Sequence, residues 1–109
     1  MYLLGSLYIE IGQTDEALAI LKKSIQLDPN HDGSLNTLAY MYAEEEKNLD
    51  EALELVKKAM KNSPDNGAYV DTLGWVYYKR KEYTKAFDAL TEANELLKAK
   101  GYDLKNDYV

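Results

Sequence analysis

Hydrophobic side chains recur along most of the chain every three or four residues, a spacing that places them on one face of an α-helix. Polar turns interrupt this pattern at regular intervals. The pattern predicts six main helices and no strand. We expect the helices near residues 2–11, 14–27, 33–45, 49–61, 67–80 and 84–100.

The helical pattern is itself repeated three times. Each copy opens with leucine, a small residue, two variable residues and tyrosine: LGSLY at 4–8, LAYMY at 38–42 and LGWVY at 73–77. Nine or ten residues after each tyrosine, an alanine opens a second apolar pattern, at Ala17, Ala52 and Ala86. The middle copy has one extra residue in its turn, and Pro29 and Pro64 close the first two copies. The unit is therefore a helix pair, with the small residue admitting a neighbouring helix.

The turns carry recognisable signals for helix ends. Asn48, followed three residues later by Glu51, has the form of an N-cap residue with its reciprocal partner. The runs DPN at 28–30 and SPDN at 63–66 are typical of segments that stop one helix and start the next. Tyr42 and Leu73 fall on the apolar face, so we expect both in the core, bridging adjacent units.

Composition supports an all-helical protein and excludes several classes of function. The 109 residues include only two prolines and six glycines, and no cysteine for disulfides, thiol catalysis or cysteine-bound zinc. A net charge of −6 argues against a nucleic-acid partner. The only basic run, Lys79 to Lys81, is interpreted as cations that offset a helix dipole.

The chain has no apolar run long enough to span a bilayer and no recognisable signal peptide. We therefore expect a soluble protein with no direct membrane insertion. A cytoplasmic location is favoured over a periplasmic one, which would need a signal outside this chain.

Candidate catalytic and metal-binding residues are sparse. His31, the only histidine, lies in a proline turn, where a solvated loop residue is expected rather than a base or ligand. The acidic run at 44–46 is interpreted as solvated surface, because consecutive helical residues point about 100° apart and do not converge on a metal. No glycine elbow or phosphate loop occurs. We expect no enzymatic activity, no cofactor and no metal.

These recurring positions resemble the tetratricopeptide repeat family, whose unit is a 34-residue helix–turn–helix. The third copy looks especially like units of bacterial proteins. The resemblance implies a right-handed α-solenoid of three antiparallel repeats, at about 1–31, 32–66 and 67–100, with 101–109 a tail or the start of a further repeat. Ser24 departs from the usual alanine, and the third copy lacks a closing proline.

The resemblance also implies a function, because in this family the first helices line a groove that holds a partner protein or peptide. By register, the groove residues are expected to include Asn36, Tyr40, Asp71, Trp75 and Tyr78, with Tyr40 and Trp75 equivalent in consecutive repeats. Aromatic side chains are good anchors for a partner. The alternative for Trp75 is simple packing on the next helix.

The partner's charge follows from the groove positions. The family's clamp for C-terminal carboxylates uses lysine, asparagine and arginine. Those positions here hold Tyr2, Ser6, Thr37, Ala68 and Thr72. Asn36, Glu44 and Asp71 instead favour a neutral or basic partner. Two alternatives stay open: a structural module that forms a homo-oligomer through its last helix, and an auxiliary region of a larger protein.

Overall fold

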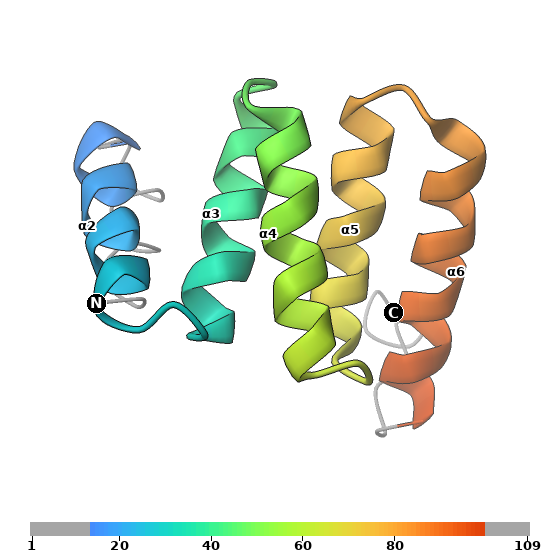
Figure 1. Ribbon diagram of the computed structural model, residues 1–109. Coiled ribbons are helices and arrows are strands. Elements are labelled where there is room, and N and C mark those ends of the chain that lie inside the picture. Colours follow the sequence, from blue (N-terminus) through green and yellow to red (C-terminus); the bar gives the residue numbers. More distant parts are fainter. Residues whose placement is uncertain (1–13, 100–109) are drawn as a thin grey trace, which may run out of the picture.

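The computed structural model describes residues 14–99, which form five α-helices joined by short turns (Figure 1). The helices are α2 (Thr14–Leu27), α3 (Asp32–Glu44), α4 (Leu49–Asn62), α5 (Gly67–Lys79) and α6 (Tyr83–Ala99). Their bounds lie within one residue of the predicted ones, and residues 14–99 contain no strand. The helix predicted at 2–11, like the groove positions Tyr2 and Ser6, lies outside the described residues.

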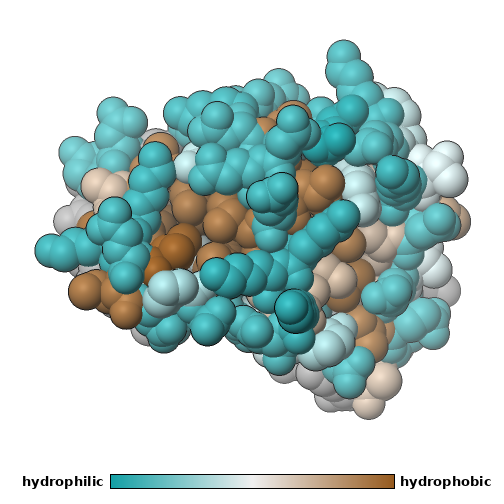
Figure 2. All heavy atoms as spheres, in the orientation of Figure 1, coloured by the Kyte–Doolittle hydropathy of each residue, from teal (hydrophilic) through white to brown (hydrophobic). Residues whose placement is uncertain are grey.

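The helices pack in the order of the chain, as expected of a solenoid. Within the described repeats, α3 packs against α4, and α5 packs against α6. Helix α3 also contacts α2 and α5, and α4 contacts α5, so each pair stacks on the next (Figure 1). On the face seen in Figure 1, hydrophilic side chains cover much of the surface and hydrophobic ones show between them (Figure 2). The fold is therefore an all-α solenoid of stacked helix pairs.

The main core joins α2, α3, α4 and α5. Tyr42 lies at its centre with only 1% of its surface exposed, packed in one cluster with Ala52, Val56 and Val76. The prediction that Tyr42 is a core residue is confirmed. Leu73 packs against this cluster and against a second one built on α5 and α6. It bridges the two clusters but is only half-buried, because one side lines a surface groove.

The small residue of the repeated motif allows close helix packing. A Cβ atom on Gly74 would lie 2.7 Å from both Cγ and Cδ2 of Leu90. Its counterpart in the preceding repeat, Ala39, is fully buried. A larger side chain at position 74 would displace Leu90, so the interpretation of this position as a point of close approach is confirmed.

The turns after α3 and α5 begin alike. Two residues beyond the end of each first helix lies a residue at positive φ, Glu46 at 54° and Lys81 at 67°. The next backbone N–H, that of Lys47 or Glu82, donates to the carbonyl of the motif tyrosine, Tyr42 or Tyr77. This is the bonding pattern by which a left-handed residue closes a helix.

The extra residue of the middle turn is accommodated at Asn48. Asn48 begins α4, as predicted, but it has φ 51° and ψ 39° and its side chain makes no capping hydrogen bond. The predicted reciprocal cap with Glu51 is therefore wrong. Asparagine tolerates the left-handed conformation that the inserted residue requires, and this conformation differs from the extended one of a capping residue. By contrast, Asn66 does cap α5, accepting from the N–H groups of Ala68 and Tyr69.

A polar network joins α2 to the start of α3. His31 is the half-buried N-cap of α3, and its Nδ1 accepts from the Ser34 N–H at 3.2 Å. The same Nδ1 lies 2.8 Å from Ser34 Oγ, which lies 2.8 Å from Ser24 Oγ. The expectation of a solvated loop histidine is thus corrected. The network also explains Ser24, which has a buried hydrogen-bond partner that alanine would lack.

Candidate functional site

A cavity of about 390 Å³ lies between α3, α5 and α6. We call it the α3–α5 cavity. Its lining residues are Asn36, Tyr40, Ala68, Asp71, Thr72, Trp75 and Leu90. The cavity forms because equivalent positions of two successive first helices lie side by side, as the repeat register requires.

Four of the five predicted site residues line this cavity: Asn36 and Tyr40 from α3, and Asp71 and Trp75 from α5. Tyr78 does not line it. Its ring stacks on Trp75 with centroids 5.3 Å apart and an angle of 10°, and it also meets the edge of Tyr83 at 5.6 Å. Tyr78 therefore supports Trp75 from outside the cavity.

Leu90 was not among the predicted site residues. Its position in the repeat indicates helix packing, and its side chain does lie against Gly74. It nevertheless keeps 39% of its surface exposed and forms part of the cavity lining. The repeat register could have identified Leu90, because α6 is the last helix that the structure describes and no later described helix covers this position.

Trp75 combines the two roles considered for it from the sequence, which are lining a groove and packing on a neighbouring helix. Its half-buried ring packs against the main core, and it also lines the α3–α5 cavity. The indole Nε1 donates to Glu44 Oε1 at 2.7 Å, joining α5 to α3. Lys79 Nζ lies 4.8 Å from the ring centroid. Contacts on several sides therefore fix the ring.

The acidic run at 44–46 is exposed, but it is more than solvated surface. Glu44 accepts the Trp75 hydrogen bond, and Glu46 forms an ion pair with Lys79 at 3.5 Å. Glu45 pairs with Lys47 at 3.1 Å. Two of these three carboxylates thus hold residues of the next repeat, a role that the sequence interpretation missed because the partners lie about 30 positions away.

Burial shapes the electrostatics of the cavity. Burial is the main cause that raises the pKa of Tyr40, and the neighbouring Glu44 carboxylate raises it further. Burial also raises the pKa of Asp71. Asn36 Oδ1 is buried and accepts no hydrogen bond from the residues that the structure describes. The cavity thus contains a buried amide oxygen, that of Asn36, and the exposed carboxylate of Asp71.

Two cations of the basic run at the end of α5, Lys79 and Arg80, are engaged in ion pairs. Arg80 is the C-cap residue, and its guanidinium pairs with Glu82 at 2.6 Å and with Asp50. The hydrogen bond from Arg80 is the main cause that lowers the pKa of Glu82. These contacts tie α4, α5 and α6 together around the turn.

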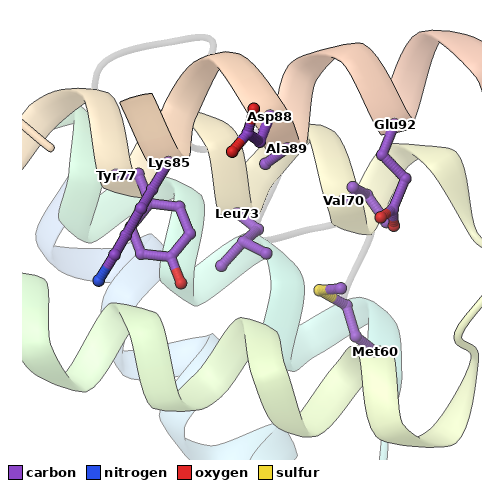
Figure 3. A pocket seen from close by; sticks show the side chains of 8 residues that line it. All are labelled: Met60, Val70, Leu73, Tyr77, Lys85, Asp88, Ala89 and Glu92. Carbon is purple, nitrogen blue, oxygen red and sulfur yellow. The ribbon is translucent and has the colours of Figure 1, made fainter. Parts of the chain in front are cut away.

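A second groove, here named the α4–α6 groove, is lined by residues of α4, α5 and α6 and has a volume of about 340 Å³ (Figure 3). Its apolar lining comes from Met60, Val70, Leu73, Tyr77 and Ala89, and its charged lining from Lys85, Asp88 and Glu92. Lys85 Nζ lies 5.7 Å from the Tyr77 ring centroid and pairs with Glu82 at 3.3 Å. This groove explains why Leu73 is only half-buried.

Residues 14–99 contain neither a cluster of metal ligands nor a membrane-spanning helix. Within that range, no group of three or more His, Asp or Glu side chains is arranged to hold a metal ion. None of the described helices has the length and apolar character needed to cross a membrane.

Comparison with known families agrees with the repeat pattern and the helix pairs. A family model described as the tetratricopeptide repeat matches residues 1–31 and 33–66, more than half of the chain. No curated protein matches the chain. Helices α5 and α6 form a further pair beyond the matched residues, with LGWVY and Ala86 at the repeat positions. The chain belongs to the tetratricopeptide repeat family.

Proposed function

We propose that this chain is a non-catalytic scaffold that binds a partner peptide or protein segment across α3 and α5, with the α3–α5 cavity at the centre of the contact. Tetratricopeptide repeats are generally protein–protein interaction modules. The observation that carries the proposal is the gathering of Tyr40 and Trp75, from successive repeats, around one cavity.

The side chains around the cavity suit a binding surface. Tyr40 keeps 41% of its surface exposed, although it is a large aromatic residue. Trp75 is held by Glu44, so little side-chain entropy is lost when a partner packs on it. Fixed aromatic side chains in partly desolvated pockets are typical of residues that dominate binding energy.

The charge of the cavity indicates a neutral or basic partner. Asp71 lines it, and Glu44 lies beside Tyr40 and Trp75. An acidic segment would place its charge against these carboxylates, and like charges in contact disfavour association.

Selection from a peptide display library tests this function. Peptides enriched on the wild-type chain are then measured against Tyr40→Ala by isothermal titration. We expect a loss of about 2 kcal/mol or more, roughly 30-fold in affinity, which is the size typical of a central aromatic anchor.

Phe87→Ala provides the matched control, because Phe87 is an aromatic residue on α6 with 70% of its surface exposed and does not line the cavity. The control is expected to bind the selected peptides like the wild type. Selected peptides that tolerate Tyr40→Ala but are lost with Phe87→Ala would place the binding surface on α6 and contradict the proposal.

A second candidate function is self-association through α6. Tyr83, Phe87 and Leu90 are exposed at i, i+4 and i+7, so they share one face of that helix. Size-exclusion chromatography with light scattering distinguishes the two functions. A scaffold is expected to elute with the mass of one chain. A self-associating module is expected to elute as a larger species, which the Phe87→Glu substitution converts to a monomer.

A further inference from the structure

Two hydrogen-bond donors that line the α3–α5 cavity are used within the protein. Trp75 Nε1 donates to Glu44 Oε1, and Thr72 Oγ1 donates to the Ala68 carbonyl at 3.1 Å. The acceptors are not used in this way. Asn36 Oδ1 has no partner among residues 14–99, and Asp71 forms no ion pair within that range.

Only one of the two acceptors is fully shielded from water. Asn36 Oδ1 is buried, and a buried acceptor without a donor costs free energy. Asp71 lines the cavity as an exposed residue, and its partial burial raises the pKa of its carboxyl group. The Asn36 side chain lines the cavity. A ligand group that brings several donors and a positive charge would satisfy both residues together.

We propose that the α3–α5 cavity is a subsite for a cationic side chain, an arginine or lysine of the partner segment. This inference rests on the proposed function and adds the chemistry that the cavity selects. Guanidinium and ammonium groups carry donors and no acceptors, which matches Asn36 and Asp71. Aromatic rings attract a cation over their faces, and the exposed side chain of Tyr40 lines the same cavity.

The chain's own cation near Trp75 does not fill this subsite. Lys79 does not line the cavity, and its ammonium lies 3.5 Å from Glu46 and 4.8 Å from the Trp75 ring centroid. Asp71 and Asn36 therefore remain available to a partner's charge.

Nuclear magnetic resonance titration of the ¹⁵N-labelled chain tests the subsite. The probes are capped pentapeptides Ala-Leu-X-Leu-Ala, in which X is arginine, lysine, citrulline or glutamate. Citrulline keeps the shape of arginine without its charge. The reporters are the side-chain amide of Asn36 and the indole N–H of Trp75, which is the only tryptophan.

We expect the arginine and lysine peptides to shift the resonances of both reporters. The peptide that binds with the higher affinity identifies the preferred cation. The citrulline peptide is expected to bind at least about tenfold more weakly, since a charged hydrogen bond contributes more than a neutral one. Asp71→Asn should remove this preference. Asp88→Asn, the same charge change on the rim of the α4–α6 groove, should keep it.

Three results would overturn the subsite. Equal binding of arginine and citrulline peptides at the Trp75 indole would reject the cationic subsite while leaving a peptide groove intact. A charge preference that survives Asp71→Asn would reflect general attraction to a chain of net charge −6. Absence of any shift at Trp75 and Asn36 would also reject the subsite, and the library selection then decides the proposed function separately.

Discussion

Replacing Glu44 with Ala should destabilise the fold, whereas replacing its neighbour Glu45 should have little effect. The two carboxylates adjoin at the end of α3, and both side chains are exposed. They differ in their partners. Glu44 accepts the hydrogen bond from Trp75 Nε1 across the repeat boundary, while Glu45 pairs only with Lys47 two residues away.

The expected magnitude follows from this difference. A hydrogen bond to a charged group contributes about 1.5–3 kcal/mol, and exposure to solvent reduces that contribution. We therefore expect Glu44→Ala to cost about 0.5–1.5 kcal/mol. Glu45→Ala should change the free energy of unfolding by less than about 0.5 kcal/mol, as surface substitutions do. The unfavourable interaction with the helix dipole is common to both residues and largely cancels in the comparison.

Urea denaturation measures both variants, and a double-mutant cycle with Trp75→Phe isolates the pair. Phenylalanine keeps an aromatic ring but removes the indole N–H. We expect a coupling energy of about 0.5–1.5 kcal/mol between positions 44 and 75 and none between positions 45 and 75. Glu44→Ala should also lower the pKa of Tyr40, since Glu44 is one cause of its elevation, although burial remains the larger one.

Equal effects of the two replacements, or a coupling energy near zero in the 44–75 cycle, would refute the reasoning. Either result would mean that Glu44 does not hold Trp75 in solution, and the ring would then lack the fixed position on which the binding surface depends.

Three further predictions concern the core, the α3 cap and the cavity. Replacing Leu35, which has 1% of its surface exposed, with Ala should lower the free energy of unfolding by about 3–5 kcal/mol. The same replacement of the half-buried Leu73 should lower it by about 2 kcal/mol. Equal losses in urea denaturation would contradict the observed burial. His31→Ala should cost about 1 kcal/mol through loss of the α3 N-cap, and His31→Asn should restore most of it, as thermal unfolding can show. Asp71→Asn should raise stability at pH 7, because burial lifts the pKa of the folded-state carboxyl above its usual 3.8 and its ionised form is destabilising. That advantage should shrink as the pH falls toward 3.8, and an advantage independent of pH would exclude ionisation as its cause.

The fold was predictable because local and long-range signals agree. Helix periodicity, proline turns and a motif recurring in register all indicate the same helix pairs. The motif also places Tyr40 and Trp75 at equivalent positions, which is why four of the five candidate residues meet at one cavity. Register alone brings these residues together, without knowledge of any individual contact.

The remaining features depend on contacts between distant residues. Nothing local distinguishes Glu44 from Glu45, yet only Glu44 faces the Trp75 indole across the repeat boundary. Asn48 has the sequence of a capping residue, but the inserted position forces a left-handed backbone that moves its side chain away from the helix N–H groups. His31 looked solvated because its partner Ser34 is buried through a contact with Ser24 of the preceding helix.

The fluorescence of Trp75 during partner binding tests the central claim most directly, because this tryptophan lines the α3–α5 cavity and is the only one in the chain. In the free protein we expect emission from a partly hydrated indole that acrylamide quenches. Saturation with a library-selected peptide should shift the emission to the blue and reduce quenching. Emission and quenching that stay unchanged at saturation would show that the partner binds elsewhere and would contradict the account.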